Sequence, residues 1–400
     1  MHFAFVIDDY LPDSTRVGSK MLHELALEFL DKGYQVTVIT PNTQVNSPAL
    51  VEENIDGVNI WRFRNGPVKD IGKIKRAINE TLMSFNAWRS ISSRVKSNTF
   101  DGVVYYSPSI FFGPLVKKIK NKCKCKAYLV LRDLFPQWAI DAGMIKEKSL
   151  ITRYFRFFES INYNNADSIG LMSTKNLQLF QSIHPNLNNA HVLFNWASPQ
   201  PFSGSRVNKN IREELGIEDK VIFFYGGNIG HAQDMANLIR LAKGLKEYVE
   251  AHFLFIGQGD EVELIKKLVD EYKLENVTIL PSVSQLIFKE ILAEVDVGLF
   301  SLAKNHTAHN FPGKLLGYMV ESIPILGSVN LGNDLQDIVN STDSGHVFIN
   351  GEDDKLLNAA KVLLDEPDVR FKQGKASFKL LEEYFSVASA TKLIQKELMN

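Results

Sequence analysis

Short apolar runs alternate with amphipathic stretches along both halves of this 400-residue chain. The amphipathic stretches repeat their apolar residues at helical spacing, as at 19–33, 234–250 and 260–273. Strands that alternate with helices predict parallel sheets with both faces covered by helices. The predicted strands are 2–7, 35–40, 58–63, 102–107, 127–132 and 168–173 in the first half, and 221–226, 252–257, 277–282, 296–301, 323–328 and 345–350 in the second.

Two such series predict two doubly wound α/β domains facing a central cleft. The join falls within 192–210, where Pro, Ser and Asn concentrate and the hydrophobic periodicity lapses. We therefore expect a first domain at 1–195, a linker at 196–210 and a second domain at 211–375. The remaining segment, 376–400, is expected to be a helix that crosses back to the first domain. Because ligands of such sheets bind at the carboxyl ends of the strands, the cleft is the expected site.

Charge is distributed unevenly between the halves. Residues 1–195 contain 24 Lys and Arg against 17 Asp and Glu, a net charge of +7, which leaves −8 for the rest of the chain. A basic half predicts an anionic partner. We expect an anionic membrane surface and no nucleic acid, because no nucleic-acid recognition motif is evident and the isoelectric point is near 6.8.

Other features bear on location and on metals. Cys123 and Cys125 lack the additional Cys or His ligands of a structural zinc site, and so few cysteines suit a reducing cytosol. No secretory signal and no apolar run of about 18 residues is evident. We expect a cytoplasmic protein.

Two basic, aromatic stretches, 69–96 and 147–163, have helical periodicity, and 117–126 holds six lysines. One interpretation is contact with a membrane interface. The other is a core-facing aromatic stripe with a solvated basic face. The sequence leaves both open.

A possible phosphate-binding segment lies at 309–319, after a predicted strand. Pro312 suits a first helical turn, Gly313 permits close approach to the backbone, and Lys314 adds a cation where free N–H groups favour an anion. The alternative is an ordinary helix whose lysine points at water.

Glycine-rich turns at 226–230 and 257–261 follow two other strands of the same domain. The first, with Gly227 and Asn228, could offer N–H groups to phosphate, whereas the second is acidic and expected mainly to pack.

In the first domain, the loop 12–20 joins the first strand to the first helix. Gly18 could let this loop approach phosphates, with Arg16 or Lys20 adding charge; an ordinary capped connection is the alternative. Arg132 and Asp133 follow a strand end, where catalytic groups of α/β folds often lie. Arg132 could neutralise phosphate and Asp133 could act on the acceptor, or the two could be a surface ion pair.

These motifs together resemble the retaining family 4 glycosyltransferases of GT-B fold over nearly the whole chain. The motifs that carry the resemblance are the Gly18 loop, FNW, GGNIG, FIGQGDE, LPSV and the helix after Pro312. The segments HNFPGKLLGYM, PDSTRVGSKMLHELA and RDLFPQWAID look closest to bacterial enzymes that transfer N-acetyl-L-fucosamine during O-antigen or capsule assembly.

The resemblance implies roles for particular residues. Lys314 would contact the donor diphosphate beside Gly227 and Asn228, Gly18 would face the phosphates, and Val283 would read the base. Asp133 would be a catalytic or sugar-contacting group. Many relatives carry two glutamates eight positions apart, where this chain has His309 and Gly317. We assign His309 to the catalytic centre and expect Glu321 to replace the ribose-binding glutamate.

The resemblance further implies a UDP-sugar donor, a lipid-linked acceptor on undecaprenyl diphosphate and a position at the cytoplasmic face of the bacterial membrane. The first domain would be the acceptor side and the second would bind the nucleotide sugar. We expect retaining, metal-independent transfer and no cofactor besides the UDP-sugar co-substrate. The alternatives are a nucleotide-sugar epimerase of similar architecture and a non-catalytic membrane-bound scaffold that has lost the two glutamates.

Overall fold

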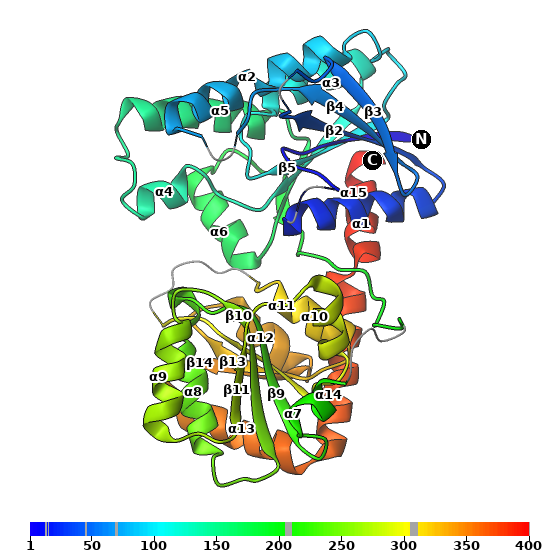
Figure 1. Ribbon diagram of the computed structural model, residues 1–400. Coiled ribbons are helices and arrows are strands. Elements are labelled where there is room, and N and C mark those ends of the chain that lie inside the picture. Colours follow the sequence, from blue (N-terminus) through cyan, green and yellow to red (C-terminus); the bar gives the residue numbers. More distant parts are fainter. Residues whose placement is uncertain are drawn as a thin grey trace. The chain divides into compact units, whose positions relative to one another are not determined.

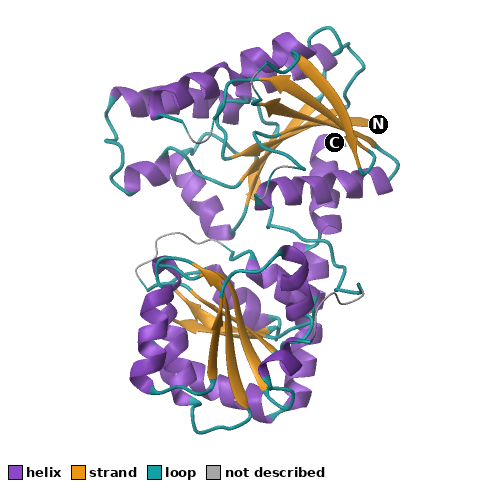
Figure 2. Cartoon of the chain, in the orientation of Figure 1, coloured by secondary structure: helices purple, strands orange, loops and turns teal. Residues whose placement is uncertain are grey.

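The computed structural model describes residues 1–12, 14, 16–44, 46–68, 71–204, 210–304 and 311–399. The chain divides into two compact α/β units (Figure 1). Unit 1 comprises Met1–Asn195 together with Val387–Asn400, and unit 2 comprises Trp196–Ser386. Figure 2 shows that each unit contains one sheet flanked by helices.

Unit 1 is built on an eight-stranded sheet in the order β3-β4-β2-β1-β5-β6-β7-β8. Every neighbouring pair is parallel except β3 and β4, which are antiparallel. The strand order reverses between β1 and β5, the position where sheets of this kind leave room for a ligand. The strands are β1 (His2–Val6), β2 (Gln35–Asn42), β3 (Leu50–Ile55), β4 (Val58–Arg64), β5 (Gly102–Ser107), β6 (Lys126–Leu131), β7 (Ser168–Leu171) and β8 (Ala190–Val192).

Helices cover both faces of this sheet. Helix α3 packs against α2 and α5, while the C-terminal helix α15 packs against α1 and β6. The Ser168 hydroxyl donates to the Glu397 carboxylate at 2.7 Å, which ties α15 to β7. The helices are α1 (Val17–Asp31), α2 (Lys73–Ile91), α3 (Gly113–Cys123), α4 (Gln137–Asp141), α5 (Leu150–Asn164), α6 (Thr174–Ile183) and α15 (Val387–Met399).

Unit 2 has a six-stranded, fully parallel sheet in the order β11-β10-β9-β12-β13-β14. Numbered within the unit, this is the 3-2-1-4-5-6 order of a dinucleotide-binding fold, with the reversal between β9 and β12. The strands are β9 (Val221–Asn228), β10 (Ala251–Gln258), β11 (Val277–Leu280), β12 (Val297–Ser301), β13 (Ile325–Val329) and β14 (Gly345–Ile349).

The cores of both sheets are apolar because their strands are nearly continuous runs of β-branched and aromatic residues, which suits burial on both faces. The helices of unit 2 are α7 (Ile211–Leu215), a 3₁₀ turn η1 (His231–Gln233), α8 (Met235–Gly244), α9 (Val262–Tyr272), α10 (Gln285–Leu292), α11 (Lys314–Val320), α12 (Asp334–Ser341), α13 (Asp353–Asp365), α14 (Pro367–Leu380) and a π-helical turn η2 (Leu381–Phe385).

Three features differ from the sequence-based expectation. Strands β3 and β8 were not expected, and the helix predicted at 234–250 ends at Gly244. The single helix predicted at 376–400 is interrupted at Ser386, whose backbone is extended. There the chain pairs with the linker, since Ala197 N–H donates to the Phe385 carbonyl at 2.9 Å. Residues 376–386 therefore belong to unit 2, and only α15 lies in unit 1.

Candidate functional site

Two glycine-rich turns interlock at the carboxyl edge of the unit 2 sheet. A Cβ on Gly257 would lie 1.8 Å from the Gly227 carbonyl oxygen, and one on Gly259 would lie 2.1 Å from the Ile229 carbonyl oxygen. Backbone contact this close excludes any side chain, so the glycines of the β10 turn serve packing, as the sequence suggested. Gly227 has a φ of +125°, which also favours glycine.

Lys314 is the first residue of α11 and reaches this pair of turns. Its Nζ lies 3.3 Å from the centre of the Tyr225 ring, and a Cβ on Gly227 would be 3.7 Å from that Nζ. Burial lowers the pKa of Lys314 well below its ordinary value. Among the described residues Lys314 forms no ion pair, so the face of an aromatic ring is what stabilises its charge. A half-buried cation of this kind is well placed to receive an anion.

The position of Lys314 depends on Tyr318, one turn later on α11. The Tyr318 hydroxyl donates to the Leu299 carbonyl at 2.9 Å and is 3.3 Å from the Phe224 carbonyl, so α11 is tied to β12 and β9. Gly298 permits this contact, because a Cβ there would lie 2.4 Å from the Tyr318 ring. Neither Tyr318 nor Tyr225 could be identified from the sequence, because both look like ordinary core aromatics.

A pocket of about 330 Å³ opens at the same edge, where the chain leaves β9, β10 and β12. His231 Nδ1 lies 3.2 Å from the Glu261 carboxylate across it, and the Asp234 carboxylate accepts from Asn350 Nδ2 at 2.9 Å. The pocket therefore presents acidic, basic and hydrogen-bonding groups together, which suits a polar ligand. Its lining residues are His231, Asp234, Glu261, Ala303 and Lys304.

Other predicted residues of unit 2 occupy different positions. Asn228 ends β9, is exposed, and donates from Nδ2 to Gln233 Oε1 at 2.9 Å. Val283 lies in the loop after β11, which is held to β10 by a 3.1 Å hydrogen bond from Ser282 to Gln258. His309 lies outside the described residues.

Glu321, expected to bind the ribose, has a partner within unit 2, and its ribose-binding role stays a prediction. It follows the last residue of α11, so it and Lys314 are at opposite ends of the helix, about 10 Å apart along the axis. Its carboxylate accepts from the Phe202 N–H at 2.8 Å and fastens the linker to α11. Gly317 also has a packing role, because a Cβ there would lie 3.0 Å from the Leu292 side chain of α10.

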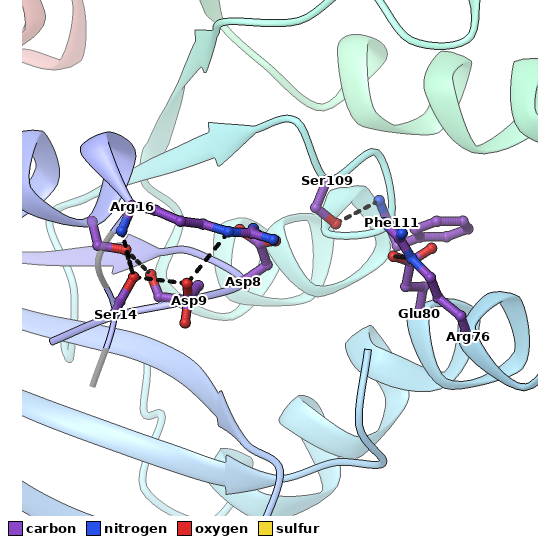
Figure 3. Close-up of polar contacts among 9 residues, drawn as sticks. Asp8, Asp9, Ser14, Arg16, Arg76, Glu80, Ser109 and Phe111 are labelled. Atoms are coloured by element: carbon purple, nitrogen blue, oxygen red, sulfur yellow. Dashed lines mark hydrogen bonds and ion pairs between the residues drawn. The ribbon is translucent and has the colours of Figure 1, made fainter. Parts of the chain in front are cut away.

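In unit 1, the carboxyl end of β1 carries a compact polar cluster (Figure 3). Arg16 lies 3.3 Å from the Asp8 carboxylate and 3.6 Å from that of Asp9. The Ser14 hydroxyl donates to Asp9 at 2.7 Å, which orders the start of α1. Lys20 also has a carboxylate partner, Glu24, at 3.7 Å. Both cations remain partly exposed, and the expectation that Arg16 or Lys20 supplies phosphate charge stays a prediction.

Gly18 and Arg132 likewise have partners within unit 1. A Cβ on Gly18 would lie 2.8 Å from the Tyr106 side chain, so Gly18 is needed for α1 to pack on β5. Arg132 is neither exposed nor paired with Asp133: its guanidinium donates to the carbonyls of Leu193 and Phe194 at 2.5 and 3.0 Å. Burial lowers the pKa of Arg132 to about 10. These two hydrogen bonds tie Arg132 to the segment that follows β8, and its role toward phosphate stays a prediction.

Asp133 is half-buried in the loop between β6 and α4. Burial raises the pKa of its carboxyl to about 6, against a lowering by a hydrogen bond from the Trp138 side chain. The charges of Arg132, Asp8 and Asp133 all act on the pKa of Tyr106, so the ends of β1, β5 and β6 meet at this edge. A carboxyl that titrates near pH 6 can exchange a proton under physiological conditions.

Comparison with known proteins identifies the architecture. Residues 207–380 match the family model described as glycosyl transferases group 1, a stretch that covers most of unit 2. The structure of HepE from Anabaena in complex with UDP and glucose superposes with a TM-score of 0.65, covering 100% of this chain and 99% of that one at 13% identity. The fold is GT-B. The predicted GT-B fold, with two Rossmann-like parallel sheets, is thus confirmed.

Several proteins similar to this chain are named as glycosyltransferases. The chain is 24% identical over 314 residues to the probable glycosyltransferase WbjE of Pseudomonas aeruginosa, covering 78% of this chain and 76% of that protein. It is also 24% identical over 325 residues to the putative colanic acid biosynthesis glycosyl transferase WcaI of Escherichia coli K12, covering 77% and 78%. WaaG, a glycosyltransferase involved in lipopolysaccharide biosynthesis, superposes with a TM-score of 0.62 at 14% identity over 100% of both chains.

Proposed function

We propose that this GT-B protein transfers a sugar from a UDP-sugar to a lipid-linked saccharide in the assembly of a bacterial surface polysaccharide. The observation that carries the proposal is the Lys314 ammonium, held against Tyr225 and beside Gly227 at the carboxyl edge of unit 2. In sugar transfer from a nucleotide donor, negative charge develops on the departing diphosphate. A fixed cation beside bare backbone stabilises that charge as it forms.

The donor and the pathway are proposed from relatives. HepE is described in complex with UDP and glucose, and a similarly folded Escherichia coli structure is described as bound with UDP-2-fluoro glucose. The name of WbjE supports glycosyl transfer, and those of WcaI and WaaG support a role in colanic acid or lipopolysaccharide biosynthesis. We propose N-acetyl-L-fucosamine as the sugar and an undecaprenyl-diphosphate-linked saccharide as the acceptor, on the sequence motifs alone.

Asp133 is the residue we propose to act on the acceptor side. Its raised pKa, about 6, lets the carboxylate be ionised at neutral pH and still accept a proton from an acceptor hydroxyl. We further propose that transfer retains the anomeric configuration, needs no metal ion or other cofactor, and takes place at the cytoplasmic face of an anionic membrane.

The test is UDP release from a panel of UDP-sugars, with lipid-diphosphate-linked N-acetylhexosamine as acceptor. Lys314→Ala should lower the turnover rate about 100-fold, since it removes the charge that stabilises the leaving group. Lys267→Ala is the matched control, because Lys267 is an exposed lysine on α9 of the same unit. Equal rates for Lys314→Ala and wild type would overturn the assignment of Lys314.

The same assay separates the alternatives. Turnover of the UDP-sugar without any acceptor would indicate an epimerase, and tight UDP-sugar binding without transfer to any acceptor would indicate a scaffold. Addition of EDTA should leave the rate unchanged if transfer is metal-independent. Nuclear magnetic resonance of the product would then establish the anomeric configuration.

A further inference from the structure

Helix α2 carries a stripe of large apolar side chains on its solvent-facing side. Ile74, Ile78, Leu82 and Phe85 follow one another at helical spacing and are 80%, 53%, 45% and 57% exposed. The opposite side of α2 is also apolar, and Met83 is among the residues that pack into the unit 1 core. A helix on the surface of a protein that meets only water is expected to be polar on its outer side. The outer stripe of α2 therefore needs a separate explanation.

Helix α5 has a second exposed stripe beside the first. Leu150, Ile151, Tyr154 and Phe157 are 81%, 50%, 37% and 61% exposed. The hydroxyls of Tyr154 and Thr81 are hydrogen-bonded, which places the two stripes next to each other, and α2 and α5 run along the same side of the unit (Figure 1). We call the combined patch the α2–α5 surface: Ile74, Ile78, Leu82 and Phe85 of α2 with Leu150, Ile151, Tyr154 and Phe157 of α5. A contiguous exposed apolar patch marks an interaction site.

Cations accompany these stripes. Lys75 lies within the α2 stripe, Lys146 and Lys148 immediately precede α5, and Arg153 lies on α5, all exposed. None of these four forms an ion pair within the part of the chain that the structure describes. Glu147 is an exposed carboxylate among them and leaves the local charge positive.

We propose that the α2–α5 surface lies flat on an anionic lipid bilayer. Its apolar side chains would enter the boundary between headgroups and acyl chains, while the cations pair with anionic headgroups. No helix within the described residues is long and apolar enough to span a bilayer, so the contact is interfacial. A second copy of this chain fits less well, because a two-fold interface would set the same cations against one another. This inference rests on the membrane location in the proposed function and assigns that contact to one surface. Vesicle binding is measured without sugar transfer, so the two proposals can fail separately.

The experiment is sedimentation of the purified full-length protein with vesicles of phosphatidylethanolamine and phosphatidylglycerol, against neutral phosphatidylcholine vesicles. The wild type should bind the anionic vesicles, with binding that weakens as salt is added. Phe85→Ser together with Phe157→Ser should weaken binding by about tenfold or more, since two large apolar contacts are lost. Lys148→Gln together with Arg153→Gln should weaken it by about fivefold for each charge removed.

The matched control is Val249→Ser with Phe371→Ser, which removes from unit 2 two apolar side chains that are more exposed, 71% and 65%, than Phe85 and Phe157. This control should bind vesicles like the wild type. Thermal melting should be unchanged in all these variants, because every altered side chain is exposed. Failure of the wild type to bind anionic vesicles, or equal loss in the unit 2 control, would overturn the proposal. So would a dimer in light scattering that only the Phe85 and Phe157 substitutions dissociate.

Discussion

Lys314 shows how a single residue can favour binding at the expense of stability. Its ammonium is desolvated in the folded protein and contacts the Tyr225 ring. Among the described residues it has no carboxylate partner. Desolvation of an ammonium costs free energy unless an opposite charge compensates it. The free protein bears this cost, and a bound diphosphate would offset it.

Lys314→Met should therefore stabilise the ligand-free protein at pH 7 by about 1 kcal/mol. The pKa of Lys314 is lower in the folded protein than the ordinary 10.5 of the unfolded chain. Between these two pKa values the unfolded chain holds a proton on Lys314 that the folded protein has lost. The stability of the wild type therefore rises with pH in this window. The advantage of the variant should thus shrink as the pH approaches 10.5. Thermal melting across pH measures this.

The same variant should lose affinity for UDP by about 100-fold, because a hydrogen bond to a charged group is removed. UDP should then raise the melting temperature of the wild type but not of Lys314→Met. A variant that is both less stable and equally responsive to UDP would contradict this account of the site.

Asp133 should impose a pH dependence on both stability and activity. The pKa of Asp133 is about 6 in the folded protein and 3.8 in the unfolded chain. The folded protein therefore gains stability as the pH falls through 6 and Asp133 is protonated. Above pH 6 the ionised carboxylate lowers the stability. Asp133→Asn should therefore raise stability at pH 7.5 by about 1 kcal/mol, allowing for solvent access to the carboxyl. The gain should vanish below about pH 4.

The activity of the wild type, measured as kcat/KM, should rise with pH around an inflection near 6, where Asp133 ionises. Asp133→Asn should be nearly inactive at every pH. An active asparagine variant with the same inflection would assign the titration to another group.

At the scale of elements, the contact between the turns after β9 and β10 determines the geometry of the carboxyl edge of the unit 2 sheet. Gly257→Ala would press a methyl group against the Gly227 carbonyl oxygen, which is backbone and cannot move aside alone. We expect a loss of about 3 kcal/mol of stability and weaker UDP binding, because Gly227 adjoins Lys314. Urea unfolding and UDP titration measure the two effects.

Gly313→Ala is the control for this substitution. A Cβ on Gly313 would meet nothing within 4 Å, and its backbone is helical, so stability should change by less than about 0.5 kcal/mol. If a diphosphate approaches this backbone closely, as the sequence suggested, the same variant should still weaken UDP binding. That role of Gly313 stays a prediction.

The elements missed from the sequence share a physical cause. Strand β3 pairs antiparallel at the sheet edge and carries exposed Glu52 and Glu53, so no apolar run marks it. Strand β8 has only three residues and owes its pairing to β7. Edge and very short strands are stabilised by a neighbour and not by their own pattern, whereas the buried central strands were all predicted.

At the scale of the whole molecule, the chain returns to unit 1 through α15. Ile394 is fully buried on this helix, in a sequence segment far from the rest of the unit. Ile394→Ala should cost about 2–4 kcal/mol, the usual cost of such a cavity, and only in unit 1. Hydrogen exchange should speed up in α1 and β6, which α15 contacts, and not in the strands of unit 2. Equal acceleration in both units would show that they unfold together.

The candidate site could be predicted only in part. The turn that contains Gly227 and the helix that begins at Lys314 were located from the sequence, because glycine turns and a Pro-started helix leave a local sequence pattern. The donor-binding roles of Lys314, Gly227 and Asn228 stay predictions. Tyr225, Tyr318, Gly298 and the His231–Glu261 pair were not, because their roles arise from contacts between distant segments. Arg16, Arg132 and Glu321 were assigned to phosphate or ribose on residue type. The structure adds a partner for each within its own unit, which the sequence could not show, and the ligand roles stay predictions.

By itself, the sequence determined the fold class, the two series of strands and the turn that offers Lys314, since periodicity and turn chemistry act over a few residues. Only the tertiary structure decided which charges are already compensated. Arg16 lies between two carboxylates and Arg132 donates to carbonyls, whereas Lys314 has an aromatic ring and no carboxylate within the described residues. A side chain's partners depend on how distant strands and helices pack, and the same residue type can therefore bind a ligand in one place and hold the fold in another.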